Sequence, residues 1–148
     1  MKILLAIDDS KFSEAATQAL LERPQSKDTE VRVLHVVEPA GLYLAGEMGA
    51  QVPDLSGVWE ARLEQAKELV ARTAERLRGA GLKVSTSVEE GDPKARILDC
   101  AAAWSADLIV VGSHGRKGLN RFLLGSVSEA VARHARCSVE IVRNHFAY

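Results

Sequence analysis

The residues with the clearest chemical pattern lie in the stretch "LIVVGSHGRKGLNRFLLGSVSEAV", residues 108–131. A run rich in β-branched residues leads into Gly112 and Gly115, and a later glycine, Gly125, directly precedes Ser126. Glycines let main-chain N–H groups approach an anion, and the N–H groups that begin a helix favour negative charge. The spacing therefore predicts a phosphate-binding loop, although the lysine that a Walker-type loop places before its serine or threonine is missing.

Positive charge in this loop comes from Arg116, Lys117 and Arg121, with no acidic residue among them. Their side chains could neutralise a phosphate in place of one fixed lysine, and the Ser126 hydroxyl could donate to a phosphate oxygen. The alternative is structural: the glycines form turns, the cations face solvent, and Ser126 caps a helix with Glu129 completing a capping box. The loop by itself leaves both interpretations open.

A second polar group follows the first apolar run, "KILLAI", where the chain reads Asp8, Asp9 and Ser10. A carboxylate there could accept a hydrogen bond from a ligand, or it could cap the next helix. His35 lies within a buried strand pattern and is expected to be a hydrogen-bonded core residue. His114 is expected to be a loop residue because no nucleophile accompanies it, and the sequence predicts no catalytic residue.

The elements that must position these groups alternate between strand and helix patterns along the whole chain. The expected strands are residues 2–7, 31–37, 83–88, 107–111 and 138–143, the third of them at a sheet edge. Helical spacing begins near Phe12, Trp59, Asp92 and Ser126; the second helix ends at Gly79 and Gly81. Asp92 is expected as an N-cap before Pro93.

This alternation predicts an α/β fold with a parallel sheet and helices on both faces. Ligands of such sheets bind beyond the carboxyl ends of the strands, where the strand order reverses. If the first and fourth strands are neighbours, Asp8 and the glycine loop face one crevice. The long connection of residues 38–57 interrupts the alternation and is expected to be a lid, a partner surface or a disordered segment.

Composition narrows the class of protein. The 148 residues predict a single domain, 1–148, and 47% hydrophobic with 26% charged residues exclude a disordered chain. A net charge of -1 supplies no general field for nucleic acid or an anionic membrane. The sequence shows no signal peptide and no apolar run of about 20 residues, so a cytoplasmic location is expected.

Cysteines and histidines predict no metal site. Cys100 and Cys137 are expected to be small core residues, since neither belongs to a C-x-x-C pair. The histidines, which lie at positions 35, 114, 134 and 145, lack the spacing of zinc ligands.

Asp8 followed by G-x-x-G, nine residues and G-S resembles the nucleotide-binding signature of the universal stress protein family, in its ATP-binding subtype. The resemblance covers nearly the whole chain. It is carried by the stretches "KILLAIDDSKFSEAA", "VLHVVEP", "GDPKARILDCA" and "VVGSHGRKGLNRFLLGSVSEAVARHARCSVEIVR". It implies a three-layer α/β/α, Rossmann-like fold of the adenine nucleotide alpha hydrolase type, with five parallel strands in the order 3-2-1-4-5.

The resemblance also implies a ligand and a site. Asp8 would bind the ribose, Ile7, Val36 and Val111 would lie beside adenine, and Arg116 would belong to the site. The residues implied around the ribose and phosphates are Gly112, Gly115, Gly125, Ser126 and Val127. The ligand would be ATP with Mg²⁺ or Mn²⁺ carried on its phosphates, since the sequence offers no carboxylate cage.

The function implied is a nucleotide-dependent regulatory module of the stress response that acts on a protein partner. A slow ATPase or phosphotransfer enzyme is one alternative, and a structural stress dimer without ligand is another. Family members usually pair their last strands in a homodimer. Here Ser138 and Glu140 depart from the family pattern, and two copies of Glu140 would repel unless a cation such as Arg143 offsets them. Asp9, where glycine is frequent, adds negative charge near the phosphates.

Overall fold

A computed structural model describes residues 1–39, 56–116 and 122–144. Predictions that concern most of the connection 38–57, the side chains of Lys117 and Arg121, and His145 fall outside the described residues.

The sheet has five parallel strands in the order β3-β2-β1-β4-β5, as predicted, so β3 and β5 form its edges. The strands are β1 (Lys2–Ala6), β2 (Glu30–Val37), β3 (Lys83–Glu90), β4 (Leu108–Gly112) and β5 (Ser138–Val142). β1 ends one residue earlier than expected and β3 runs two residues further. The described helices are α1 (Lys11–Glu22), α3 (Ser56–Gly79), α4 (Pro93–Trp104) and α5 (Ser126–His134).

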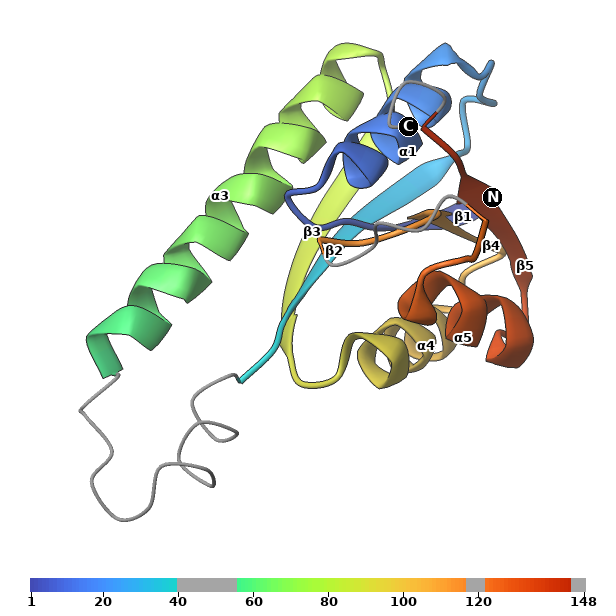
Figure 1. The fold of residues 1–148 in the computed structure, drawn as a ribbon. Helices are drawn as coiled ribbons and strands as arrows, with labels where there is room; N and C mark the ends of the chain where they lie inside the picture. Colours follow the sequence, from blue (N-terminus) through green and yellow to red (C-terminus); the bar gives the residue numbers. More distant parts are fainter. Residues whose placement is uncertain (40–55, 117–121, 145–148) are drawn as a thin grey trace.

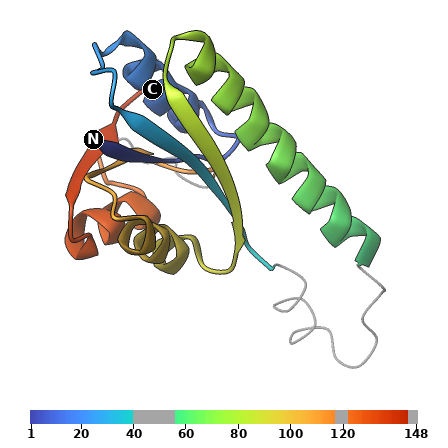
Figure 2. The ribbon, with the colours of Figure 1, turned by 180° about the vertical axis from the view of Figure 1, so that it is seen from behind.

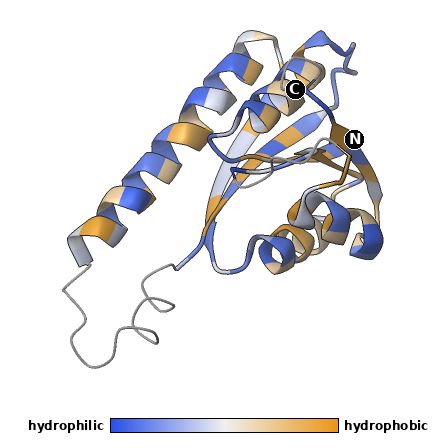
Figure 3. Ribbon diagram, in the orientation of Figure 1, coloured by the Kyte–Doolittle hydropathy of each residue, from blue (hydrophilic) through white to orange (hydrophobic). Residues whose placement is uncertain are grey.

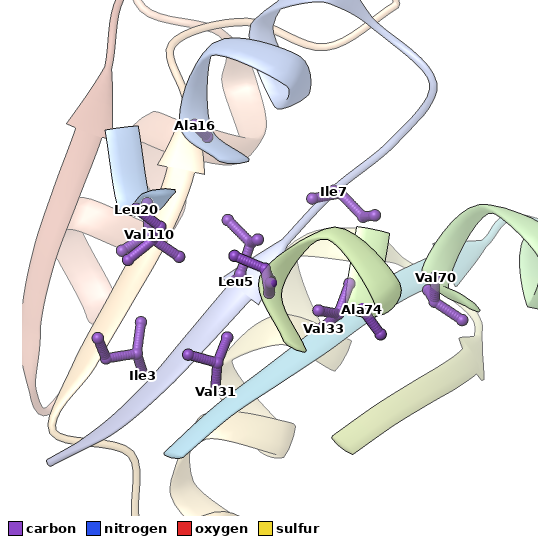
Figure 4. Packing of buried hydrophobic residues seen from close by; sticks show 11 residues of the cluster. Ile3, Leu5, Ile7, Ala16, Leu20, Val31, Val33, Val70, Ala74 and Val110 are labelled. Atoms are coloured by element: carbon purple, nitrogen blue, oxygen red, sulfur yellow. The ribbon is translucent and has the colours of Figure 1, made fainter. Parts of the chain in front are cut away.

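The helices cover both faces of the sheet, which gives the three predicted layers (Figures 1 and 2). Alternate strand residues separate into two clusters: Leu5 and Val33 pack with residues of α1 and α3, whereas Leu4 and Leu34 pack with residues of α4 and α5. Figure 4 shows the first cluster. Because both faces are covered, the central strands are apolar at nearly every position, which explains their continuous hydrophobic runs.

The long helix α3 packs on β2 and β3 along one apolar stripe, so hydrophobic and hydrophilic residues alternate along it (Figure 3). Its buried residues are Ala66, Val70, Thr73, Ala74 and Leu77. It ends at Gly79 as predicted, and the following turn contains Gly81 with a φ of 89°, a conformation that favours glycine.

The structure corrects one prediction about a helix start and confirms another. α5 begins at Ser126 with Gly125 as its N-cap, so Ser126 and Glu129 do not form a capping box. The hydroxyl of Ser128 instead donates to the carbonyls of Ser113 and Gly125. Asp92 is the N-cap of α4, as predicted, but its side chain makes no capping hydrogen bond.

Cys100 and Cys137 are half-buried free thiols beside the second cluster, and they are less enclosed than expected of core residues. Burial raises the pKa of both thiols. Less thiolate is therefore present at neutral pH than for an ordinary cysteine, which argues against a nucleophilic role. Within residues 1–39, 56–116 and 122–144, no helix is long and apolar enough to cross a membrane.

Candidate functional site

A pocket of about 830 Å³ lies at the carboxyl ends of β1, β2 and β4, between α3 on one side and the beginnings of α4 and α5 on the other. We call it the edge pocket. The register that pairs Ala6 of β1 with Val111 of β4 brings the two predicted polar segments to its floor. Every residue predicted for the site lines it: Ile7, Asp8, Val36, Val111, Gly112, Gly115, Arg116, Gly125, Ser126 and Val127. Their individual roles toward a ligand stay predictions.

The two carboxylate oxygens of Asp8 have different surroundings: one accepts hydrogen bonds at the start of α1, and the other lies beside Gly115. Its Oδ1 accepts from the main-chain N–H of Ser10 at 2.9 Å and from the hydroxyl of Ser13 at 2.8 Å. Ser10, and not Asp8, caps α1. Within the described part of the chain Oδ2 takes no hydrogen bond, and it lies 3.0 Å from where a Cβ on Gly115 would stand. Oδ2 is therefore a positioned acceptor.

The three signature glycines lie where other parts of the protein pack closely against them. A Cβ on Gly112 would lie 2.7 Å from the main-chain carbonyl of Phe12, so β4 and α1 could not approach as they do. A Cβ on Gly125 would lie 3.1 Å from the Cα of His114. The glycines thus let α1, Asp8 and the start of α5 converge on one point, a requirement that the sequence does not reveal.

The first turn of α5 forms one wall of the edge pocket with Ser126, Val127 and Ser128. Gly125 has no side chain to accept hydrogen bonds from the N–H groups of this turn, and no side-chain cap is formed. Unpaired N–H groups and the helix dipole attract anions. The arrangement suits a negatively charged group at this end of the pocket.

Arg116 forms an ion pair with Asp9 across the mouth of the edge pocket. The pair joins the loop after β4 to the loop after β1. Arg116 therefore lines the edge pocket, but in this structure its guanidinium is held by a carboxylate of the same chain.

The two histidines of the site are buried, and both contact main-chain carbonyl oxygens. Nδ1 of His35 lies 2.7 Å from the carbonyl oxygen of Ile7, which confirms His35 as a hydrogen-bonded core residue. The imidazole of His114 contacts the carbonyl oxygen of Leu123 and lies 3.0 Å from the hydroxyl of Ser113. His114 is thus a buried structural member of the loop, more enclosed than a loop residue is expected to be.

The sequence interpretation missed the contribution of two helices to the edge pocket. α4 supplies its beginning, and α3 supplies a polar face beside its apolar stripe. The missed residues on these elements are Arg62, Gln65, Glu68, Leu69, Arg72, Pro93, Lys94 and Ile97. The spacing of three or four residues between Arg62, Gln65, Leu69 and Arg72 was the available signal, but it does not show that this face meets the sheet edge.

No group of three or more His, Cys, Asp or Glu side chains that could hold a metal ion occurs among residues 1–39, 56–116 and 122–144.

Comparisons of the sequence with a family model and with known proteins indicate the same family. Residues 1–143 match the universal stress protein family. Universal stress protein YxiE of Bacillus subtilis is 33% identical, over 96% of this chain and 98% of YxiE. A universal stress protein of Mycolicibacterium smegmatis is 35% identical over 97% of this chain, which spans 46% of that longer protein.

Solved structures show the same fold. The protein MJ0577 superposes with a TM-score of 0.84 at 28% identity, over 98% of this chain and 96% of MJ0577. A universal stress protein in complex with cAMP has a TM-score of 0.66 at 21% identity, over 97% of this chain and 96% of its own. An Arabidopsis thaliana family protein with AMP bound has a TM-score of 0.66 at 20% identity, over 99% of this chain and 93% of its own.

Proposed function

This chain belongs to the universal stress protein family, and we propose that it binds ATP in the edge pocket and acts as a nucleotide-dependent regulatory module. Nucleotide occupancy would alter the loops around the pocket and so the binding of a protein partner in the cytoplasm.

One observation carries the proposal: a carboxylate oxygen that takes no hydrogen bond from the described residues and a helix start without a side-chain cap line the same pocket. Oδ2 of Asp8 is suited to accept hydrogen bonds from ribose hydroxyls, because a carboxylate is a strong acceptor. The N–H groups at the start of α5 are suited to phosphates. Ile7, Val36 and Val111 add apolar surface for a base. A nucleotide combines these three kinds of group in one molecule.

Adenine nucleotides are favoured by two structures of the same fold, since one relative is a complex with cAMP and another has AMP bound. ATP is favoured over these by the family signature around Gly112, Gly115 and Gly125. Mg²⁺ or Mn²⁺ would be carried on the phosphates, because the described side chains form no cage of their own.

A binding role is favoured over an enzymatic one by the state of the two histidines. His35 and His114 are the side chains best suited to act as a base near neutral pH, and both are engaged with main-chain carbonyl oxygens. A slow ATPase or phosphotransfer activity would be detected as phosphate release above that of a variant unable to bind ATP.

Substitution of Asp8 by asparagine tests the site. Asparagine keeps an Oδ1 acceptor for Ser10 and Ser13 but replaces the pocket-facing oxygen by an amide donor. We expect ATP affinity to fall by at least about tenfold in calorimetric titration, the effect of losing a hydrogen bond to a charged group. Thermal unfolding of Asp8→Asn should stay close to that of the unaltered protein.

Asp99→Asn is the matched control. Asp99 is also an acidic residue, but it pairs with Arg96 on the surface of α4 and does not line the edge pocket. Its substitution should leave ATP binding unchanged. Equal ATP affinity of Asp8→Asn and the unaltered protein would refute the site, and absence of any ATP binding by the unaltered protein would refute the function.

A further inference from the structure

We propose that His114 is a positioning residue that holds the start of α5 in place for the phosphates of the ligand. The proposal rests on nucleotide binding at the edge pocket, but it concerns a different part of the molecule from Asp8. It assigns to His114 neither proton transfer nor direct binding.

His114 joins the two ends of the glycine loop. It is the second residue after β4, is 8% exposed, and its ring packs against Phe12 at a centroid distance of 5.0 Å. Its Nε2 contacts the carbonyl oxygen of Leu123, nine residues further along the chain. A carbonyl oxygen can only accept, so Nε2 carries the hydrogen and donates it.

The second ring nitrogen fixes this arrangement. With the hydrogen on Nε2, Nδ1 of the neutral ring accepts, and the hydroxyl of Ser113 lies 3.0 Å away as its donor. The neutral imidazole therefore has a suitable partner at both nitrogens. Contacts to Ser113 and Leu123, on opposite sides of the ring, both favour this orientation.

Hydrogen bonds to the main chain of Ser113 also connect the end of β4 to the start of α5. The N–H of Gly125 donates to the carbonyl of Ser113 at 2.8 Å, and the Ser128 hydroxyl donates to the same carbonyl at 2.9 Å. A Cβ on Gly125 would stand 3.1 Å from the Cα of His114, so the helix start lies directly against the histidine backbone. Substitution of His114 by phenylalanine removes the link to Leu123 together with the Nδ1 contact to Ser113, and it leaves these main-chain contacts in place.

The link between His114 and Leu123 lies near the region proposed to bind the phosphates and not near the surface proposed to bind the base. The N–H groups proposed to bind phosphates belong to the first turn of α5, which starts three residues after Leu123. The apolar surface proposed for the base belongs to β1, β2 and β4, whose strand pairing does not depend on His114. Loss of the link should therefore weaken binding of the phosphates and spare binding of the nucleoside.

The experiment compares His114→Phe with His114→Gln. Phenylalanine keeps an aromatic ring beside Phe12 but removes both polar nitrogens. Glutamine keeps an amide N–H near the place of Nε2. We expect His114→Phe to lose about tenfold in ATP affinity, near the effect of one hydrogen bond. Adenosine affinity should change less than about twofold, and His114→Gln should restore ATP affinity to within about threefold of the unaltered protein.

His134→Phe is the matched control, because His134 is exposed in the last turn of the same helix and lies outside the edge pocket. It should bind ATP and adenosine as the unaltered protein does. The proposal is refuted if His114→Phe binds ATP normally, or if it loses ATP and adenosine affinity equally.

Amide hydrogen exchange tests the same link without ligand. The segment 122–130 should exchange faster in His114→Phe than in the unaltered protein or in His114→Gln. Unchanged exchange would overturn the positioning role whether or not ATP binds. Faster exchange in His114→Phe, in a protein that does not bind ATP, would support the positioning of α5 by His114 and would refute only the proposal of nucleotide binding.

Discussion

Some side chains of the edge pocket use one polar atom to stabilise the fold and leave another available to a ligand. Asp8 uses Oδ1 to order the start of α1 and leaves Oδ2 toward the loop of Gly115. Although the Asp9 side chain is largely exposed, its carboxylate is not left to solvent, because it forms an ion pair with Arg116. A bound phosphate would have to compete with Asp9 for the guanidinium.

Removal of the Asp9 charge should therefore strengthen ATP binding. The side chains of this pair are 59% and 55% exposed for Asp9 and Arg116, so solvent and salt screen the effect. We expect Asp9→Asn to raise ATP affinity by about two- to fivefold at low salt, with a smaller gain at high salt. Adenosine, which carries no phosphate, serves as the control ligand. Calorimetric titration measures both, and an affinity for ATP that is unchanged or weaker at low salt contradicts the competition.

At the scale of elements, the site depends on how closely β4 and α5 approach their neighbours. The residue at the end of β4, Gly112, lies against the main chain of Phe12, and Gly125 lies against His114. These contacts are with backbone atoms, which cannot rotate away as a long side chain can. Glycine at these positions sets the distance between elements, in addition to any role toward phosphate.

Gly112→Ala should destabilise the fold for this reason. The added Cβ would stand 2.7 Å from the Phe12 carbonyl, so β4 and α1 would have to separate. We expect the free energy of unfolding to fall by about 1–3 kcal/mol, as for other overpacked sites. Gly79→Ala is the control, because a Cβ at the end of α3 meets no atom within 4 Å. Denaturant unfolding compares the two, and equal stability of Gly112→Ala and Gly79→Ala would disprove the packing argument.

At the scale of the molecule, β5 is an edge strand whose charge is neutralised within the chain. Val139 and Ile141 pack toward α4 and α5, whereas Val142 packs on the other face. Glu140 forms an ion pair with Arg23, the C-cap residue of α1. The expected cation, Arg143, is thus replaced by one from a distant part of the sequence. We propose that the chain forms a homodimer through β5, since the pair removes the repulsion that Glu140 would otherwise cause.

Arg23→Ala should weaken that dimer. The substitution leaves Glu140 unpaired near its copy across the two-fold axis, and like charges across strands cost a few tenths to about 1 kcal/mol per pair. We expect the dimer dissociation constant in sedimentation experiments to rise by about two- to fivefold. The double variant Arg23→Ala/Glu140→Ala should recover most of the loss. A monomer at all concentrations of the unaltered protein would rule out the dimer, and an unchanged constant for Arg23→Ala would rule out the role of the pair.

The sequence by itself determined the layers and the strand positions, because local patterns carry that information. Continuous apolar runs mark strands buried on both faces, and spacing of three or four residues marks the helix stripes. The strand order 3-2-1-4-5 came from the resemblance to a family, since apolar runs do not specify their neighbours. The positions of Asp8 and the glycines at the strand ends were then enough to predict residues that share one pocket.

Only the tertiary structure decided what those residues do for one another. The pairing of Asp9 with Arg116 and of Arg23 with Glu140 joins residues 107 and 117 positions apart. The polar face of α3 becomes part of the edge pocket because the helix packs on β2 and β3. Gly125, not Ser126, is the N-cap residue of α5, and Ser128 bonds back to Ser113. Each of these depends on distances between segments remote in sequence, and such distances are set by packing of the whole molecule rather than by local residue pattern.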